Sequence, residues 1–178
     1  MITKEEMVDV YNPITFSKTG EVITKTKAHK EGIWHSSIHL IIVDKDRIKT
    51  LFQQRATDKS LYPNMWDIAV GGHISTGETD YEAVRRELQE ELGINPFGLD
   101  IRFIKQYKEE LFSNGINNKE IVSIFMLLNN IKLEEIRLQQ EEVKDIKWVT
   151  KMEMESLINN KLVIPHNEEY KILRKVLK

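Results

Sequence analysis

Short apolar stretches rich in β-branched residues alternate with turn residues over much of the chain, a pattern typical of strands. The clearest is HSSIHLIIVD at 35–44, which ends at a polar Asp-Lys-Asp turn. A second apolar stretch follows at 48–54, so we expect the two segments to form a hairpin. The same criteria predict strands at 7–11, 21–26, 65–70, 101–107, 121–127 and 145–149, the fourth and fifth of these paired around a turn-rich segment at 113–118.

A helical period replaces the alternation at 81–92, where apolar residues recur on one face. Thr79 or Asp80 can cap the start of this helix, and Gly93 is a common left-handed terminator. Two further helices are predicted near the C-terminus, at 152–160 and 168–178. Because helices and strands are mixed without regular βαβ alternation, we expect an α+β sandwich with a mostly antiparallel or mixed sheet flanked by helices.

Composition narrows the class of protein. The 178 residues are 40% hydrophobic and 30% charged, which suits one globular domain over 1–178 and argues against disorder. Apolar runs such as Leu40 to Val43 are far too short to span a membrane, and a net charge of −2 does not favour long nucleic acid as a partner. The first ten residues, MITKEEMVDV, contain no signal-peptide pattern, so we expect a cytoplasmic protein.

The predicted helix at 81–92 carries a cluster of acidic residues. Glu87, Glu90 and Glu91 are spaced i, i+3 and i+4, so their carboxylates converge on one side and repel one another unless a cation lies between them. The chain has no cysteine, so any metal must be held by oxygen or imidazole ligands. Carboxylates in this arrangement suit Mg²⁺ or Mn²⁺, with an ordinary solvated face as the alternative.

The glutamates also belong to a longer pattern that includes glycines, which a solvated surface does not need. Gly72 is followed after five residues by Glu78, after seven more by Arg86-Glu87-Leu88, and then by Glu90-Glu91 and Gly93-Ile94. These residues fill every fixed position of the Nudix box, G-x5-E-x7-R-E-U-x-E-E-x-G-U with U aliphatic, so the chain resembles the Nudix hydrolases. The resemblance implies the Nudix fold, an α/β/α sandwich with a mixed β-sheet flanked by helices. It also implies metal-dependent cleavage of nucleoside diphosphates linked to another moiety.

The resemblance assigns a role to each residue of the motif. Gly72 would offer a backbone carbonyl to the metal, since a glycine lets the main chain approach closely. Glu87, Glu90 and Glu91 would be metal ligands and catalytic residues, and either of the last two would also orient or deprotonate the attacking water. The structural residues of the motif would be Glu78, Arg86 and Gly93.

A second resemblance, to the type 1 isopentenyl-diphosphate isomerases, rests on Ala28-His29, His35, QQRATDKSLYPNMWD and Gly72-His73. These enzymes share the Nudix fold but move a double bond, and their catalytic cysteine stands where this chain has Gly71. They also lack the intact R-E-x-x-E-E that this chain keeps, so we expect a hydrolase from the isomerase-like side of the superfamily. Their metal ligands correspond to His29, His35, His73 and Asn118-Lys119-Glu120, with Asn118 in place of a carboxylate.

Several polar residues outside the box are candidates for the substrate site. Arg55 and Lys59 could hold a diphosphate, and we expect His35 and His73 to contact the substrate. Glu120 is a candidate catalytic residue, either as an extra metal ligand or as the general base.

Some alternatives stay open at this stage. Glu141 and Glu142 are rival general bases, and Arg55 and Lys59 could be ordinary surface charge. The partner is expected to be a small diphosphate compound, with isomerase-like chemistry or non-catalytic diphosphate binding as the other readings. The N-terminal strands could pair between two subunits in a homodimer.

Overall fold

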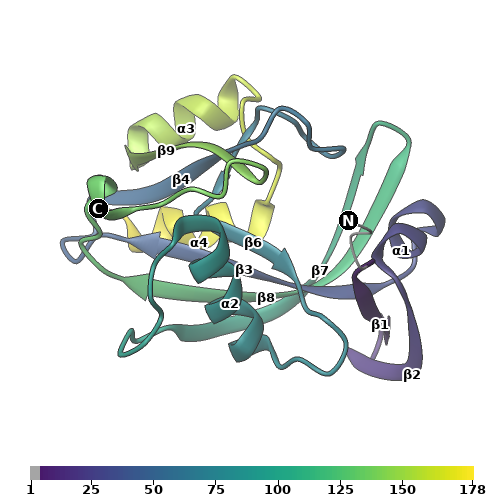
Figure 1. Cartoon of the computed structure of the whole chain (residues 1–178). Coiled ribbons are helices and arrows are strands. Elements are labelled where there is room, and N and C mark those ends of the chain that lie inside the picture. Colours follow the sequence, from purple (N-terminus) through teal and green to yellow (C-terminus); the bar gives the residue numbers. More distant parts are fainter. Residues whose placement is uncertain (1–4) are drawn as a thin grey trace.

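A computed structural model describes residues 5–178, and the first four residues of the N-terminal stretch discussed above lie outside them (Figure 1). The strands are β1 (Met7–Asn12), β2 (Ser17–Thr24), β3 (His35–Val43), β4 (Lys49–Arg55), β5 (Trp66–Ile68), β6 (Val70–His73), β7 (Arg102–Ser113), β8 (Ile116–Leu128) and β9 (Val143–Thr150). The helices are α1 (Lys25–Glu31), α2 (Asp80–Leu92), α3 (Lys151–Asn159) and α4 (Asn167–Val176), with a short 3₁₀ helix at Leu133–Glu135.

The strands form a two-stranded sheet, β1-β2, and a seven-stranded mixed sheet. In the larger sheet the order is β5-β4-β3-β8-β7, while β6 also pairs with β3 and β9 with β4. The β3–β8 pairing is parallel, and the others are antiparallel. The predicted α+β class and mixed sheet are therefore confirmed.

Helices cover both faces of the larger sheet. Ile38, Leu40 and Ile42 of β3 belong to a core that includes apolar residues of α2. Ile41 and Val43, which alternate with them, belong to a second core that includes residues of α3 and α4. β3 is thus buried on both faces, which explains the continuous apolar run of its second half, Leu40–Val43. None of the helices within residues 5–178 is long and apolar enough to cross a membrane.

The predicted hairpin at 35–54 exists only next to its turn. Val43 pairs with Thr50, and beyond that pair the two strands diverge. β3 takes β6 and β8 as neighbours, whereas β4 takes β5 and β9. β6 pairs with β3 in the region where β4 has diverged from it, and β6 contains Gly72, the first residue of the acidic motif.

The predicted strand at 21–26 ends earlier than expected. Thr24 closes β2 and caps α1, because its hydroxyl accepts a hydrogen bond from the Lys27 N–H. α1 has only seven residues and ends at Gly32 with a φ of 63°, and the sequence prediction missed it. The β7–β8 hairpin is longer than predicted, since both strands run to a tight turn at Asn114 and Gly115, which have φ values of 50° and 77°.

Candidate functional site

The ends of α2 are set by the residues that the sequence suggested. Thr79 and Glu82 form a capping box, in which each side chain accepts a hydrogen bond from the other residue's backbone N–H. Gly93 ends the helix with a φ of 66°. With these ends fixed, Glu87, Glu90 and Glu91 all lie in the last two turns of α2.

The Arg86 guanidinium connects the acidic helix to the loop before it. Nε and Nη2 each donate to the Glu78 carboxylate at 2.8 Å, and Nη2 also donates to the carbonyl of His73 at 3.0 Å. Nη1 donates to Glu87 at 2.7 Å and to Glu90 at 3.1 Å. Arg86 therefore ties the loop to the helix and fixes the direction of two of the acids.

Burial disfavours the ionised form of two of the helix carboxylates. It raises the pKa of Glu87 to about 7, although Arg86 opposes the shift. Glu91 is almost fully buried, and burial together with the neighbouring Glu87 raises its pKa well above the usual range. Gln53 offers only a long hydrogen bond to Glu91, at 3.2 Å. Two such carboxylates ionise together when a cation lies between them, so this donor set fits a divalent ion.

Gly72 lies directly against one of these acids. A Cβ at this position would be 2.6 Å from Glu87 Cγ, far inside ordinary contact. The β6 backbone can approach the Glu87 side chain this closely only because the residue is glycine. This close approach suits a metal ion held jointly by the Gly72 carbonyl oxygen and the helix carboxylates.

A cavity of about 390 Å³, here called the box cavity, lies over the acidic helix. Acidic side chains form part of its lining: Glu6, Glu87, Glu90, Glu91 and Glu142. The cationic side chains of Lys25, Arg55 and Lys59 are also in its lining, although Lys59 pairs with Glu142 and Lys25 with Glu6. The box cavity thus combines groups that suit a metal ion with groups that suit phosphate oxygens.

Three histidines and a glutamate form a compact cluster beside the box cavity. One ligand atom from each of His29, His35, His73 and Glu120 lies within 4.8 Å of the others. His73 Nε2 is 3.1 Å from His29 Nε2 and 3.0 Å from Glu120 Oε1. His35 Nδ1 lies 2.8 Å from the carbonyl of Ile33, to which it donates. His35 Nε2 faces Glu120 at 3.6 Å and has no hydrogen-bond partner.

Burial favours the neutral form of two histidines in this cluster, which is the form that binds a metal ion. Burial lowers the pKa of His29 to about 4 and lowers the pKa of His73 as well. Burial alone would raise the pKa of Glu120, but His35 and His73 hold it well below the usual range. Two imidazoles that favour the neutral form, beside a carboxylate and the unpartnered Nε2 of His35, fit a bound cation.

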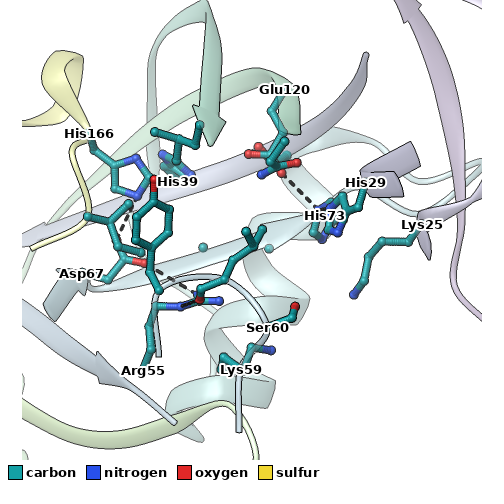
Figure 2. Close-up of a pocket in the computed structure, with 18 residues that line it drawn as sticks. Lys25, His29, His39, Arg55, Lys59, Ser60, Asp67, His73, Glu120 and His166 are labelled. Atoms are coloured by element: carbon teal, nitrogen blue, oxygen red, sulfur yellow. Dashed lines mark hydrogen bonds and ion pairs between the residues drawn. The ribbon is translucent and has the colours of Figure 1, made fainter. Parts of the chain in front are cut away.

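A second cavity of about 150 Å³, here called the inner cavity, shares lining residues with the box cavity. Figure 2 shows His39, Asp67 and His166 on one side of it, with His73 and Glu120 on the other. Lys25, Arg55, Lys59, Gly71, Gly72 and His73 line both cavities. A ligand could therefore extend from one cavity into the other.

Comparison with known proteins identifies the family. The model of the NUDIX domain matches residues 34–171. This chain belongs to the Nudix family. It is 35% identical over 149 residues to Nudix hydrolase 3 of Arabidopsis thaliana, a match that covers 82% of this chain but only 19% of that protein.

Other Nudix relatives are closer in length. An uncharacterized Nudix hydrolase of Clostridium acetobutylicum is 33% identical over 141 residues, with 78% of this chain and 68% of that protein covered. An isopentenyl-diphosphate Delta-isomerase of Dinoroseobacter shibae is 27% identical over 139 residues, with 78% and 77% covered. The predicted membership of the superfamily and the likeness to the isomerases are both confirmed.

Solved structures confirm the Nudix fold. The crystal structure of DR0079 from Deinococcus radiodurans matches with a TM-score of 0.74 and 21% identity, covering 97% of this chain and all of that one. The NUDIX domain of Shewanella oneidensis NrtR, in complex with ADP ribose, matches with a TM-score of 0.59 and 17% identity. That match covers 78% of this chain and 85% of that chain.

The Nudix fold gathers most of the predicted site residues around the two cavities. Gly72 and the three helix glutamates line the box cavity, while Arg55, Lys59 and His73 line both cavities. Glu120 lines the inner cavity. His35 is the exception, because it is fully buried and lines neither cavity. It belongs to the histidine cluster, and the prediction that it contacts the substrate is not supported.

Sequence reasoning missed a buried ionic network at the far side of the inner cavity. His39 Nδ1 lies 2.6 Å from Glu169, while His166 lies 3.0 Å from Asp67 and 2.9 Å from Glu109. Burial alone would lower the pKa of His166, but the two carboxylates raise it well above the usual value. No local motif joins these residues, since His39 and Glu169 are 130 positions apart.

Proposed function

We propose that this Nudix protein is a divalent metal-dependent hydrolase that cleaves the diphosphate linkage of a small nucleoside diphosphate-X compound by attack of water at phosphorus. The observation that carries the proposal is the box cavity. There the acids of α2 share the lining with Arg55 and Lys59, so one small space offers groups for a metal ion and groups for a diphosphate. The ADP ribose bound by the NrtR NUDIX domain is a compound of this class.

Gly72, Glu87, Glu90 and Glu91 would hold Mg²⁺ or Mn²⁺. The raised pKa values of Glu87 and Glu91 support this assignment, because a cation supplies the charge that their surroundings lack. When bound, the ion would neutralise charge on the phosphoryl oxygens and make water more acidic.

The remaining roles belong to residues of the chain. Arg55 and Lys59 would hold the diphosphate, which requires Lys59 to exchange its contact with Glu142 for one with phosphate. Glu90 is the most exposed of the helix acids and would orient or deprotonate the attacking water. Glu120 suits the role of base less well, because its low pKa makes it a weak proton acceptor.

The histidine cluster would hold a second cation through His29, His35, His73 and Glu120. The unpartnered Nε2 of His35 and the lowered pKa values of His29 and His73 support this role. Titration of the protein with Mn²⁺, followed by calorimetry, tests both sites. We expect two binding events, one of which is lost in His73→Ala and the other in Glu91→Gln.

Activity is tested by supplying nucleoside diphosphate-X compounds, dinucleoside polyphosphates and prenyl diphosphates with Mg²⁺ or Mn²⁺. We expect release of a monophosphate, and a loss of kcat of about 100-fold or more in Glu90→Gln or Glu91→Gln. Wild-type turnover in both variants would show that the roles are wrongly assigned.

The isomerase-like reading is favoured by the histidine cluster but lacks the catalytic cysteine, whose place is held by Gly71. Formation of dimethylallyl diphosphate from isopentenyl diphosphate would establish it. Binding of diphosphates without turnover would instead establish a non-catalytic domain. The cytoplasmic location and a homodimer formed through the N-terminal strands stay predictions, for which fractionation and size-exclusion chromatography are the tests.

A further inference from the structure

Arg55 lines both cavities, and its guanidinium is only partly engaged. Nε donates a hydrogen bond to the carbonyl of Leu61 at 3.0 Å, which fixes the position of the group. The Asp67 carboxylate is a neighbouring anion, but the distance from Arg55 Nη1 to Asp67 Oδ2 is 3.8 Å, too long for a hydrogen bond. Within residues 5–178 the two terminal nitrogens of Arg55 therefore remain available as donors to a ligand.

Asp67 is a buried carboxylate, and such a group would ordinarily bind a nearby guanidinium directly. It is held instead by His166, whose Nε2 lies 3.0 Å from Asp67 Oδ1. The Ile68 N–H donates to the same oxygen at 2.7 Å. Figure 2 shows Asp67 between His166 and Arg55. Asp67 thus has two cationic neighbours and is hydrogen-bonded to only one of them.

His166 comes from the C-terminal part of the chain, as the residue that precedes α4. Its other ring nitrogen, Nδ1, lies 2.9 Å from Glu109 Oε2. Both ring nitrogens thus face carboxylate oxygens, and an imidazole donates from both of them only when it is protonated. Despite the burial of His166, its pKa is raised well above the usual value by Glu109 and Asp67, which agrees with this geometry. His166 is therefore the cation that neutralises Asp67.

The charge of His166 decides which group Arg55 binds. Without that charge, Asp67 would be a buried anion with the Arg55 guanidinium 3.8 Å away. A hydrogen bond between an arginine and a carboxylate is about 2.8 Å long, so a movement of about 1 Å would close the pair. The pair would occupy Nη1 of Arg55, and a diphosphate would have to break it before it could bind there.

We propose that His166 is a positioning residue for diphosphate binding: by pairing with Asp67, it prevents that carboxylate from capturing the Arg55 guanidinium. This inference rests on the proposed hydrolase function, in which Arg55 holds the diphosphate. Both ring nitrogens of His166 are already engaged, so it has no donor left for a substrate and acts through Arg55. A residue next to the C-terminal helix thereby sets how strongly the site binds its substrate.

The test measures the binding of methylenediphosphonate, a diphosphate analogue whose carbon bridge is not hydrolysed, by calorimetry with Mg²⁺ present. His166→Gln should raise the dissociation constant about tenfold, because the analogue must compete with the new pair between Arg55 and Asp67. The double variant Asp67→Asn/His166→Gln should restore the dissociation constant to within about twofold of wild type, because a neutral amide does not capture Arg55.

A double-mutant cycle separates this role from general support of the fold. Arg55→Ala should weaken binding at least as much as His166→Gln, and the two changes together should cause no further loss than Arg55→Ala alone. With ADP ribose as substrate, His166→Gln should raise KM about tenfold and leave kcat within about twofold, because Arg55 contacts the diphosphate in ground and transition states alike. A partly unfolded preparation would instead lower the apparent kcat and leave KM unchanged.

Tyr170→Phe is the matched control. Tyr170 is a buried residue of α4, and its hydroxyl donates to the carbonyl of Ile164 at 2.7 Å, two residues before His166. The variant loses a buried hydrogen bond in the same segment without changing a charge beside Asp67. Its dissociation constant for the analogue should therefore match that of wild type.

Four results would overturn the inference. They are wild-type affinity in His166→Gln, no recovery in the double variant with Asp67→Asn, an equal loss from His166→Gln with and without Arg55, and wild-type affinity in Arg55→Ala. If His166→Gln does not fold, the single variant Asp67→Asn decides in its place. It should bind the analogue at least as tightly as wild type, and weaker binding would show that Asp67 holds Arg55 in place, contrary to the inference.

Failure of the proposed function gives a different result. If no diphosphate compound is hydrolysed by the wild-type protein, the hydrolase function is wrong. The calorimetric affinities of the variants for methylenediphosphonate need no turnover, so they still support or overturn the role of His166.

Discussion

Gly72→Ala is a sharp perturbation of the site, because it replaces a hydrogen with a methyl group where the backbone lies against Glu87. The new Cβ would lie 2.6 Å from Glu87 Cγ, so that atom must retreat by about 0.8 Å to reach an ordinary contact of 3.4 Å. The Glu87 carboxyl group lies nearer still and must move further. A misplacement of about 1 Å can cost about 100-fold in rate. We therefore expect kcat/KM for the best diphosphate substrate to fall about 100-fold, with weaker binding of Mg²⁺ in calorimetry.

Stability should change little, which separates this effect from misfolding. Gly72 does not have a positive φ, so alanine adds no backbone strain, and the group that must move is a flexible side chain. Gly71→Ala is the matched control, since the nearest atom to its Cβ would be in the His39 ring at an ordinary 3.5 Å. We expect it to cost at least tenfold less in kcat/KM than Gly72→Ala. Wild-type kinetics in Gly72→Ala, in a protein whose crystal structure shows Glu87 displaced, would refute the role assigned to this acid.

Three further predictions concern pH and stability. Affinity for Mg²⁺, measured by calorimetry, should rise as pH increases through about 7, because Glu87 must lose its proton before it can bind a cation; a flat profile from acid to alkaline pH would contradict this. His166→Gln should lower the free energy of unfolding by about 3–5 kcal/mol at pH 6, since it leaves Asp67 and Glu109 buried without their cation. The raised pKa of His166 stabilises the fold fully below the unfolded value of 6.5, so wild-type stability in urea should fall as pH rises above 6.5 through the folded value, and the variant should lose this slope. Thr79→Ala should cost about 1 kcal/mol in thermal melts by removing the cap of α2, and an unchanged melting temperature would argue against that cap.

Features encoded by neighbouring residues could be predicted from the sequence. The helix at 81–92, its capping box and its glycine terminator are contiguous, and the structure places α2 one residue earlier at Asp80–Leu92. β3 could also be predicted from neighbouring residues, because its β-branched and apolar residues are contiguous, and all nine of its residues are buried. The acidic motif fixed the candidate metal ligands because all of them lie within one short loop and helix.

Features that depend on distant partners could not be predicted. β3 diverges from β4 because β3 pairs with β6 and β8, whereas β4 pairs with β5 and β9. Nothing in 35–54 reveals these distant partners. α1 was missed because a seven-residue helix carries too short an apolar period to be recognised. Its position matters for the site, because α1 brings His29 within reach of His73.

The position of the site follows from a change from polar to apolar residues along one face of β3 and β8. On β3, His35, Ser37 and His39 are followed by Ile41 and Val43, and the parallel pairing sets His35 beside Glu120 and His39 beside Ile124 of β8. The carboxyl ends of both strands are thus apolar on this face and belong to the core that includes residues of α3 and α4.

Their amino ends are polar on this face, and the cavities form there. Gly71 lies opposite His39 and Gly72 opposite Ile38, where side chains would otherwise fill the space. A chain with apolar residues at 35, 37 and 39 would extend the core and close the inner cavity, whatever the acidic helix contained. The Nudix box would therefore supply the reacting groups, while the polar half of β3 and β8 would supply the room for a substrate and the hydrogen-bonding groups that select it.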